Sequence, residues 1–159
     1  ITDYCLDEVA NHAFALLLAL NRKLRPLDTA IRDGEREPLG PCGGLRDETL
    51  GLVAFGHIAQ EVARRAPPFG LRVIAYDPDV GAEPAAGMGV QLVSLDEVMR
   101  ESAYISVHPP LNEETRGLVG AEQLALMKPS AQLVTTCRGG VVDEGALYDA
   151  RQAERIAVA

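Results

Sequence analysis

The sequence predicts an α/β fold in which helices cover both faces of a doubly wound, mostly parallel sheet, with a long helix at the N-terminus. From residue 48 onward, short apolar segments alternate with segments of helical character, which is the order that builds a parallel sheet. Several of the apolar segments are continuous, as in strands that are buried on both faces. The chain has 159 residues, of which 47% are hydrophobic, so it is large enough for one domain with a core of its own.

The first expected element is a helix over residues 8–24, in which Val9, Leu16 and Leu20 recur at helical spacing. The stretch AFALLLAL within it is apolar on nearly every side, so we expect this helix to be buried on more than one face. Packing in the protein's own core and contact with another subunit are both consistent with this pattern. A loop rich in glycine and proline follows at residues 33–47.

The alternating region then supplies the sheet and the helices that connect its strands. Strands are expected at 50–55, 71–76, 90–93, 103–107, 131–136 and 155–159, and helices at 57–66, 94–101, 121–127 and 143–151. Ser94 and Glu97 have the spacing of a capping box, and Asp143 occupies the N-cap position of the last helix. Pro67 and Pro68 are expected to end the helix that precedes them.

Charge and cysteine content argue against several functions. The net charge is −8 and the pI is about 4.8, whereas a nucleic-acid-binding surface needs clustered lysine and arginine. The same acidic balance argues against binding to anionic membrane surfaces. Cys5, Cys42 and Cys137 show no CxxC spacing, so we expect neither a metal site nor a disulfide framework. Free thiols in an acidic chain indicate a cytoplasmic protein.

The stretch GLVAFGHIAQ, residues 51–60, has the pattern of a strand, a tight turn and the start of a helix. A dinucleotide-binding unit carries G-x-G-x-x-G at this point, and the three positions here hold Ala54, Gly56 and Ala59. Gly56 keeps the place where a side chain would collide with phosphates, and Ala59 adds one methyl where helix and strand pack. We expect Ala54 to be tolerated at the end of the strand with a negative φ.

Asp77 strengthens the nucleotide interpretation. It ends the next expected strand, roughly 20 residues beyond Gly56, where a carboxylate accepts hydrogen bonds from both hydroxyls of a ribose. The same charge repels a 2′-phosphate, so the sequence predicts NAD in preference to NADP. The alternative is that YDPD is an acidic turn without a ligand.

Five stretches resemble the D-isomer-specific 2-hydroxyacid dehydrogenases: DEVANHAFALLLALNR, ETLGLVAFGHIAQEVARRAPPFGLRVIAYDP, SLDEVMRESAYISVHPPLNEETRGLVG, ALMKPSAQLVTTCRGGVVDEGALYDA and ERIAVA. They cover nearly the whole chain in the order and spacing of that family, which includes D-3-phosphoglycerate dehydrogenase and the C-terminal binding proteins. The resemblance implies a Rossmann-like NAD-binding domain over residues 1–159. Residues 1–32 would form the leading helix and a candidate dimer contact, and 48–159 the dinucleotide-binding core.

The resemblance also implies a set of residues that bind the cofactor. They lie at the turn facing the pyrophosphate, at the ribose-binding acid, in the loop HPPLNEET over the cofactor, and in the segment before the catalytic arginine. The residues are Gly56, His57, Ile58, Asp77, His108, Pro109, Pro110, Thr115, Thr136 and Cys137. Cys137 stands where the family usually has alanine, a small buried change that we expect to do little harm.

Arg138 is the candidate catalytic residue. The matching arginine of the family holds the substrate carboxylate and polarises its 2-oxo group, and a guanidinium is suited to this because it is always charged and bidentate. The alternative is an arginine that neutralises a nearby acidic loop. The family's catalytic His, its orienting Glu and its nicotinamide-binding Asp lie downstream of this arginine, and we expect the chain to lack them and the substrate domain.

Two functions follow from this resemblance. The first is the NAD-binding domain of an oxidoreductase that moves hydride between nicotinamide and a D-2-hydroxy or 2-oxo acid, with the chain alone binding NAD but turning over poorly. The second is a non-catalytic NAD(H)-sensing dimerisation or scaffold module like the C-terminal binding proteins. A homodimer through the first helix is expected in either case.

Overall fold

The protein is described here by a computed structural model, which covers residues 4–35, 42–153 and 156. It confirms the α/β fold: five strands form one sheet in the order β3-β2-β1-β4-β5, and every described pair is parallel. The strands are β1 Thr49–Val53, β2 Arg72–Tyr76, β3 Gln91–Leu92, β4 Tyr104–Val107 and β5 Gln132–Thr135. The chain starts the sheet at its centre, builds outward to β3 and then returns to add β4 and β5. The strand order therefore switches direction between β1 and β4.

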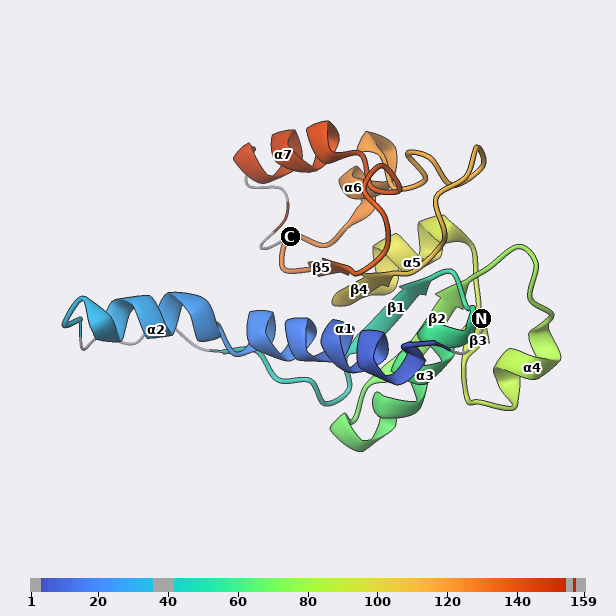
Figure 1. Cartoon of the computed structure of the whole chain (residues 1–159), viewed down its shortest axis with the longest axis horizontal. Helices are drawn as coiled ribbons and strands as arrows, with labels where there is room; N and C mark the ends of the chain where they lie inside the picture. The colour runs from blue at the N-terminus through green and yellow to red at the C-terminus, as the bar shows by residue number, and fades with distance from the viewer. Residues whose placement is uncertain (1–3, 36–41, 154–155, 157–159) are drawn as a thin grey trace.

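Helices cover both faces of this sheet (Figure 1). They are α1 Leu6–Asn21, α2 Leu24–Arg32, α3 His57–Arg65, the 3₁₀ helix η1 Pro67–Phe69, α4 Ala82–Ala86, α5 Leu95–Glu101, α6 Ala121–Leu126 and α7 Glu144–Gln152. Helices α1 and α3 lie against one face, and α5, α6 and α7 lie on the other (Figure 1).

Each face of the sheet has its own hydrophobic core. Leu50 and Leu52 point into the core under α1 and α3, whereas Val53, Ile105 and Val107 belong to the core under α5, α6 and α7. Successive side chains of a strand point to opposite faces, so a strand covered on both sides needs apolar residues at every position. This explains the continuous apolar runs from which the parallel sheet was predicted.

The first helix departs from the expected span. The prediction of one helix over 8–24 is wrong, because the chain breaks at Lys23, whose φ is +52, and a second helix, α2, begins at Leu24. Figure 1 shows α2 extending away from the sheet, and Leu24 and Ile31 are 56% and 72% exposed. The short helices η1 and α4 are also absent from the sequence prediction.

Helix α1 packs in the core along one face. Its Ala13, Phe14 and Leu17 are buried in the core that it shares with α3. At the other end of the contact, the Arg65 guanidinium pairs with Asp7 at 2.6 Å and so ties α3 to α1. The prediction that this helix packs in the protein's own core is therefore confirmed for one of its faces.

The predicted helix boundaries hold where the sequence supplies a specific stop or cap. Ser94 and Glu97 form the capping box, with both hydrogen bonds at 3.2 Å. Asp143 Oδ1 accepts a hydrogen bond from the Ala146 N–H at 3.0 Å, and α3 ends before the two prolines. The strand expected at 155–159 lies outside the described residues except for Ile156, which is buried.

Candidate functional site

The turn after β1 differs from the expected one at Ala54. Its φ is +70, so the prediction of a negative φ at this position is wrong. Two hydrogen bonds flank this conformation: the Ala54 N–H donates to the Tyr76 carbonyl at 2.8 Å, and the Phe55 N–H donates to Asp77 Oδ2 at 2.7 Å. The Phe55 side chain is fully buried. An L-residue in the left-handed region costs about 1–2 kcal/mol, which the surrounding contacts offset.

Gly56 lies at the N-cap of α3 and borders open space. A Cβ built on it would meet no atom of the described residues within 4 Å, and its φ of −73 is accessible to any residue. The packing of the chain thus gives no reason for glycine here, whereas a ligand that approaches the backbone closely does. The fully buried Ala59 lets α3 pack tightly behind this turn, whose free N–H groups favour an anion.

A pocket of about 870 Å³ opens beside this turn. It gathers residues from the ends of β1, β4 and β5 and from the start of α1, at the point where the strand order switches direction. Its walls hold Leu6, Val9, Gly56, His57, Ile58, Ala59, His108, Pro109, Pro110, Leu111, Thr136, Cys137 and Arg138. Every site residue predicted from the sequence lines it, apart from Asp77 and Thr115.

Four of these wall residues were not anticipated as site residues, and one of them, Ala59, belongs to the glycine-motif positions of the turn. Leu111 lies in the HPPLNEET stretch, so its neighbours in sequence were a usable signal. Leu6 and Val9 come from α1, whose start is far from the strands in sequence. No local pattern marks them, because only the packing of α1 against α3 brings them to the pocket.

Asp77 lies at the end of β2, outside this pocket. Its Oδ2 accepts the Phe55 N–H at 2.7 Å and its Oδ1 accepts the Asp79 N–H at 2.9 Å. A carboxylate oxygen can accept two hydrogen bonds, and each Asp77 oxygen accepts one of these backbone N–H groups. Both oxygens therefore keep a free lone pair for a ribose hydroxyl. Recognition of a ribose by Asp77 stays a prediction.

Thr115 shapes the loop that carries the prolines. Its Oγ1 donates to the Pro110 carbonyl at 2.5 Å and accepts from the Asn112 N–H at 2.9 Å. The Thr115 N–H in turn donates to Asn112 Oδ1 at 2.8 Å. These bonds fold the loop that presents Pro109 and Pro110 to the pocket, and a direct contact of Thr115 with the cofactor stays a prediction.

Two buried polar atoms in the wall have no hydrogen-bond partner among the described residues: His108 Nε2 and Thr136 Oγ1. The register Val107↔Thr135 places their residues side by side at the ends of β4 and β5. Burial lowers the pKa of His108 to about 4, so its imidazole is neutral at pH 7. Unpaired buried polar atoms are costly, and polar groups of a ligand would satisfy them.

Arg138 is exposed beyond the end of β5 and lines the same pocket, as the sequence predicted. The described residues give its guanidinium no ion-pair partner, so neutralisation of an acidic loop has no structural support. His57 and His108 share the pocket with it, while the third histidine, His12, is exposed on α1. The neighbouring Cys137 is half-buried, with its Sγ 3.1 Å from Thr135 Oγ1.

The site therefore suits a dinucleotide and a small anion. The turn leaves space at Gly56 and α3 presents its first N–H groups. Among the described residues, two polar atoms of the wall and the Arg138 guanidinium have no partner. In the described ranges, no cluster of His, Cys, Asp and Glu could hold a metal ion. Within the same ranges, no helix is long and apolar enough to cross a membrane.

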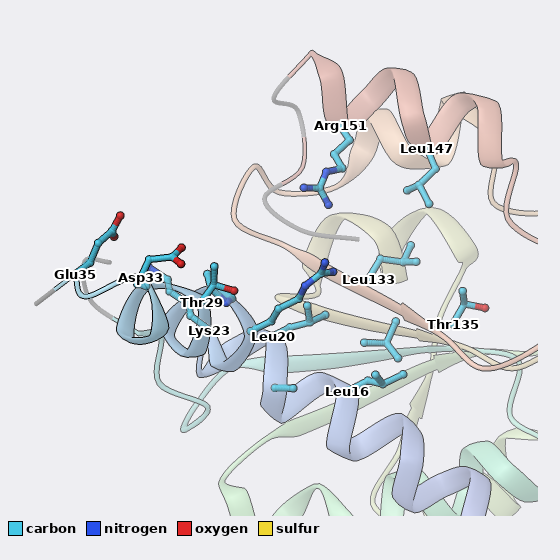
Figure 2. A pocket seen from close by; sticks show the side chains of 15 residues that line it. Leu16, Leu20, Lys23, Thr29, Asp33, Glu35, Leu133, Thr135, Leu147 and Arg151 are labelled. Carbon is cyan, nitrogen blue, oxygen red and sulfur yellow. The ribbon is translucent and has the colours of Figure 1, made fainter. Parts of the chain in front are cut away.

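A second pocket of about 830 Å³ lies along the other end of α1, between α1, α2, β5 and α7. Figure 2 shows Leu16, Leu20, Leu133 and Leu147 around this groove. Charged side chains surround it, including Lys23, Asp33, Glu35 and Arg151 (Figure 2). No site residue predicted from the sequence lines this apolar groove.

Known proteins are similar to this chain in sequence and in fold. Residues 14–159 match the family described as D-isomer specific 2-hydroxyacid dehydrogenase, NAD binding domain. The chain is 43% identical over 142 residues to the hydroxypyruvate reductase of Thermotoga maritima, an alignment that covers 89% of this chain and 45% of that enzyme.

Solved structures agree with the sequence match. The D-lactate dehydrogenase of Aquifex aeolicus, complexed with NAD and lactic acid, superposes with a TM-score of 0.92 at 34% identity, over 99% of this chain and 48% of that one. An acyclic imino acid reductase in complex with NADPH and D-Arg gives a TM-score of 0.88 at 38% identity, over 98% of this chain and 50% of that one. The chain spans about half the length of these relatives.

Proposed function

The chain belongs to the D-isomer-specific 2-hydroxyacid dehydrogenases, of which it is an NAD-binding domain, and we propose that it serves the transfer of hydride between NAD and a small D-2-hydroxy or 2-oxo acid. One observation carries the proposal: the pocket at the switch point combines an open backbone at Gly56 with an exposed, unpaired guanidinium at Arg138. Ligands of open α/β sheets bind at this place, outside the carboxyl ends of the strands.

The residues of the pocket divide the cofactor between them. The backbone at Gly56 and the first N–H groups of α3 would hold the pyrophosphate, and Asp77 would accept the hydroxyls of the adenosine ribose. Neutral His108 and Thr136 would hydrogen-bond to polar groups nearer the nicotinamide. When bound, NAD supplies the hydride chemistry that no side chain of the protein provides.

Arg138 would bind and orient the substrate. Its guanidinium would grip the substrate carboxylate with two parallel hydrogen bonds, and the apolar side chains of Leu6, Val9 and Leu111 would restrict water around the reacting carbon. Glyoxylate, pyruvate and hydroxypyruvate have the size and charge for this arrangement. We propose that the 159-residue chain alone oxidises NADH poorly with them, because His108, whose pKa burial lowers to about 4, is not an imidazolium at pH 7 and is a poor proton donor.

The experiment for this role compares Arg138→Ala and Arg138→Lys in the full-length gene product. Arg138→Ala should lower kcat/KM for 2-oxo acids by about 10²- to 10³-fold, the usual effect of removing one preorganised donor. Arg138→Lys keeps the charge but loses the bidentate geometry, so it should be intermediate. The Kd for NADH should change little in both, and an unchanged kcat/KM in Arg138→Ala would refute the role.

Preference for NAD over NADP is the finer part of the proposal. A structural relative of the same fold is described with NADPH, so the fold alone does not decide the cofactor, and the charge at Asp77 supports NAD. Titration of NADH and NADPH by nicotinamide fluorescence should give at least about tenfold tighter NADH binding. Equal or tighter binding of NADPH would contradict the proposal.

We also propose a homodimer in a cytoplasmic protein, which both the enzyme and an NAD(H)-sensing module would accommodate. The observation that favours a dimer is the apolar groove, together with the exposed Leu24 and Ile31 on the neighbouring α2. The free thiols Cys5, Cys42 and Cys137 support a reducing compartment. Catalysis by the full-length gene product would separate the enzyme from the sensing module.

A further inference from the structure

The turn that approaches the cofactor contains an alanine in a conformation that favours glycine, and we propose that Asp77 is the positioning residue that holds it there. Asp77 would then have two roles: it fixes the left-handed turn at Ala54, and it remains available to the ribose. The inference rests on the proposed cofactor site, and it adds a task to Asp77 that ribose binding does not require.

The sheet ladder explains why a side chain is needed at this point. The last register pair of β1 and β2 is Val53↔Tyr76, and the Ala54 N–H still donates to the Tyr76 carbonyl at 2.8 Å. At φ +70 the chain then leaves the ladder, so the Phe55 N–H no longer meets a carbonyl of β2. The carboxylate of Asp77 replaces that carbonyl and accepts the Phe55 N–H at 2.7 Å.

The carboxylate is itself held in place. Its other oxygen, Oδ1, accepts the N–H of Asp79 at 2.9 Å, which fixes the orientation of the side chain across the turn after β2. On the other side, Gln60 Nε2 donates to the Phe55 carbonyl at 3.1 Å, and the Phe55 ring is fully buried. The residue that follows Ala54 is thus restrained at its N–H, its carbonyl and its side chain.

The hydrogen bond from the Phe55 N–H to Asp77 is strong enough to decide the conformation of Ala54. The cost of an L-residue in the left-handed region is of the same order as the net strength of one hydrogen bond to a charged group. Without the carboxylate, Ala54 gains by relaxing to a negative φ, and that change would turn Gly56 and the start of α3 away from the pocket. A glycine at position 54 has no such reason to relax.

A double substitution separates this role from ribose binding. The probe is reduced nicotinamide mononucleotide, which carries a phosphate but no adenosine ribose for Asp77 to bind. Asp77→Ala should weaken its binding to the 159-residue chain by about tenfold, although removal of a negative charge near a phosphate would by itself tighten binding. Ala54→Gly/Asp77→Ala should return the affinity to within about threefold of the wild type, because glycine keeps the left-handed turn without the carboxylate. The tenfold loss in Asp77→Ala corresponds to about 1.4 kcal/mol.

Two further variants serve as controls. Asp79→Ala removes the same charge from the same turn but keeps the backbone N–H that Asp77 accepts, so it should bind the probe like the wild type or slightly better. Asp77→Asn retains one carbonyl acceptor and should fall between the wild type and Asp77→Ala. Unchanged or tighter binding in Asp77→Ala would overturn the proposal, as would a folded double variant that binds no better than Asp77→Ala.

Amide hydrogen exchange tests the turn without any cofactor. The Gln60 N–H donates to the Gly56 carbonyl at 2.9 Å at the start of α3, so it should exchange slowly in the wild type, faster in Asp77→Ala, where the turn relaxes, and slowly again in Ala54→Gly/Asp77→Ala. Unchanged exchange in Asp77→Ala would refute the positioning role. Failure of the wild type to bind NADH would instead refute the proposed function, and the exchange result would still decide the role of Asp77.

Discussion

The two pockets beside α1 have nearly the same volume and opposite chemistry. The pocket at the ends of β1, β4 and β5 holds a guanidinium and two buried polar atoms that have no partner among the described residues, whereas the groove toward α2 and α7 is lined by leucines with charges around it. One helix contributes to both, with Leu6 and Val9 at its start and Leu16 and Leu20 near its end. Volume therefore does not identify the ligand site of this protein. The unsatisfied polar groups in its wall, together with Arg138, favour the first pocket as the candidate site, because a small polar ligand would satisfy them.

A glycine pair tests the polar pocket most strongly. Gly56→Val should weaken NADH binding by about 100-fold or more, equivalent to about 2.7 kcal/mol, because the new side chain fills the space next to the backbone. The unfolding midpoint should stay nearly unchanged, since a Cβ there meets no atom within 4 Å in the part of the chain that the structure describes.

Gly51→Ala is the matched control for that prediction. Its Cβ would collide with Ser102 Oγ and Val98 on the buried side of β1, so it should destabilise the fold instead. Thermal unfolding and NADH titration of both variants give the comparison. Destabilisation by Gly56→Val, with NADH binding intact, would show that the open space at Gly56 is not a ligand site.

His108 makes the polar pocket sensitive to acid. Its pKa of about 4 lies below the ordinary value of 6.5, so the unfolded chain binds the proton more readily than the folded one. The contribution of His108 to stability is complete above about pH 6.5 and is lost as the pH falls toward 4. Between pH 7 and pH 5 we expect a loss of roughly 1–2 kcal/mol from this group.

Urea unfolding at both pH values, with His108→Asn beside the wild type, measures that loss. The variant cannot take up the proton, so its stability should decline less over the same interval. Equal declines in the two proteins would show that His108 is protonated as easily in the folded state as in the unfolded one.

The apolar groove is tested by two adjacent leucines of α1. Leu16 lines the groove, whereas Leu17 is only 2% exposed and belongs to the core under α1 and α3. Leu16→Glu should weaken the proposed dimer at least about tenfold and leave the fold intact, because a charge would face an apolar contact. Leu17→Glu should unfold the chain.

Sedimentation at micromolar concentration and circular dichroism distinguish these outcomes. A wild type that sediments as a monomer would contradict the dimer directly. A dimer that Leu16→Glu leaves unchanged would place the contact elsewhere than in the groove.

The smallest expected effect is that of Ala54→Gly in the wild-type background. Because φ is +70 there, glycine should stabilise the fold by about 1 kcal/mol, and NADH binding should stay the same or improve slightly. Chemical denaturation and NADH titration measure the two effects. A loss of stability would mean that the methyl group makes a contact that compensates for the backbone cost.

Local patterns were enough to predict most of the sheet, and the family resemblance added the candidate site residues. The continuous apolar runs around Leu52, Ile74 and Ile105 predicted strands that are buried on both faces, and the caps at Ser94 and Asp143 marked helix starts that the structure confirms. The resemblance to the family implied a common site for Gly56, His108 and Arg138, and the parallel sheet brings these residues to one pocket because the carboxyl ends of parallel strands meet at one edge.

The features that the sequence could not supply depend on contacts between distant segments. Alanine by itself favours a negative φ. At Ala54 the φ is positive, and Tyr76 at the end of β2 and Asp77 directly after it accept hydrogen bonds from the N–H groups of the turn. The break at Lys23 lies within an apolar pattern that continues to Leu24, so periodicity did not reveal it. Leu6 and Val9 reach the pocket only because α1 packs across α3.

The sequence by itself determined the fold class, the positions of most strands and helices, and the nucleotide-binding character of the turn after β1, because periodicity, capping and strand-end residues act over a few neighbouring positions. Tertiary structure decided the conformation of the turn after β1, the direction of α2, and which residues line each of the two pockets. These depend on the free energy of contacts between segments far apart in the chain, and such contacts offset local costs of about 1–2 kcal/mol that no local pattern records.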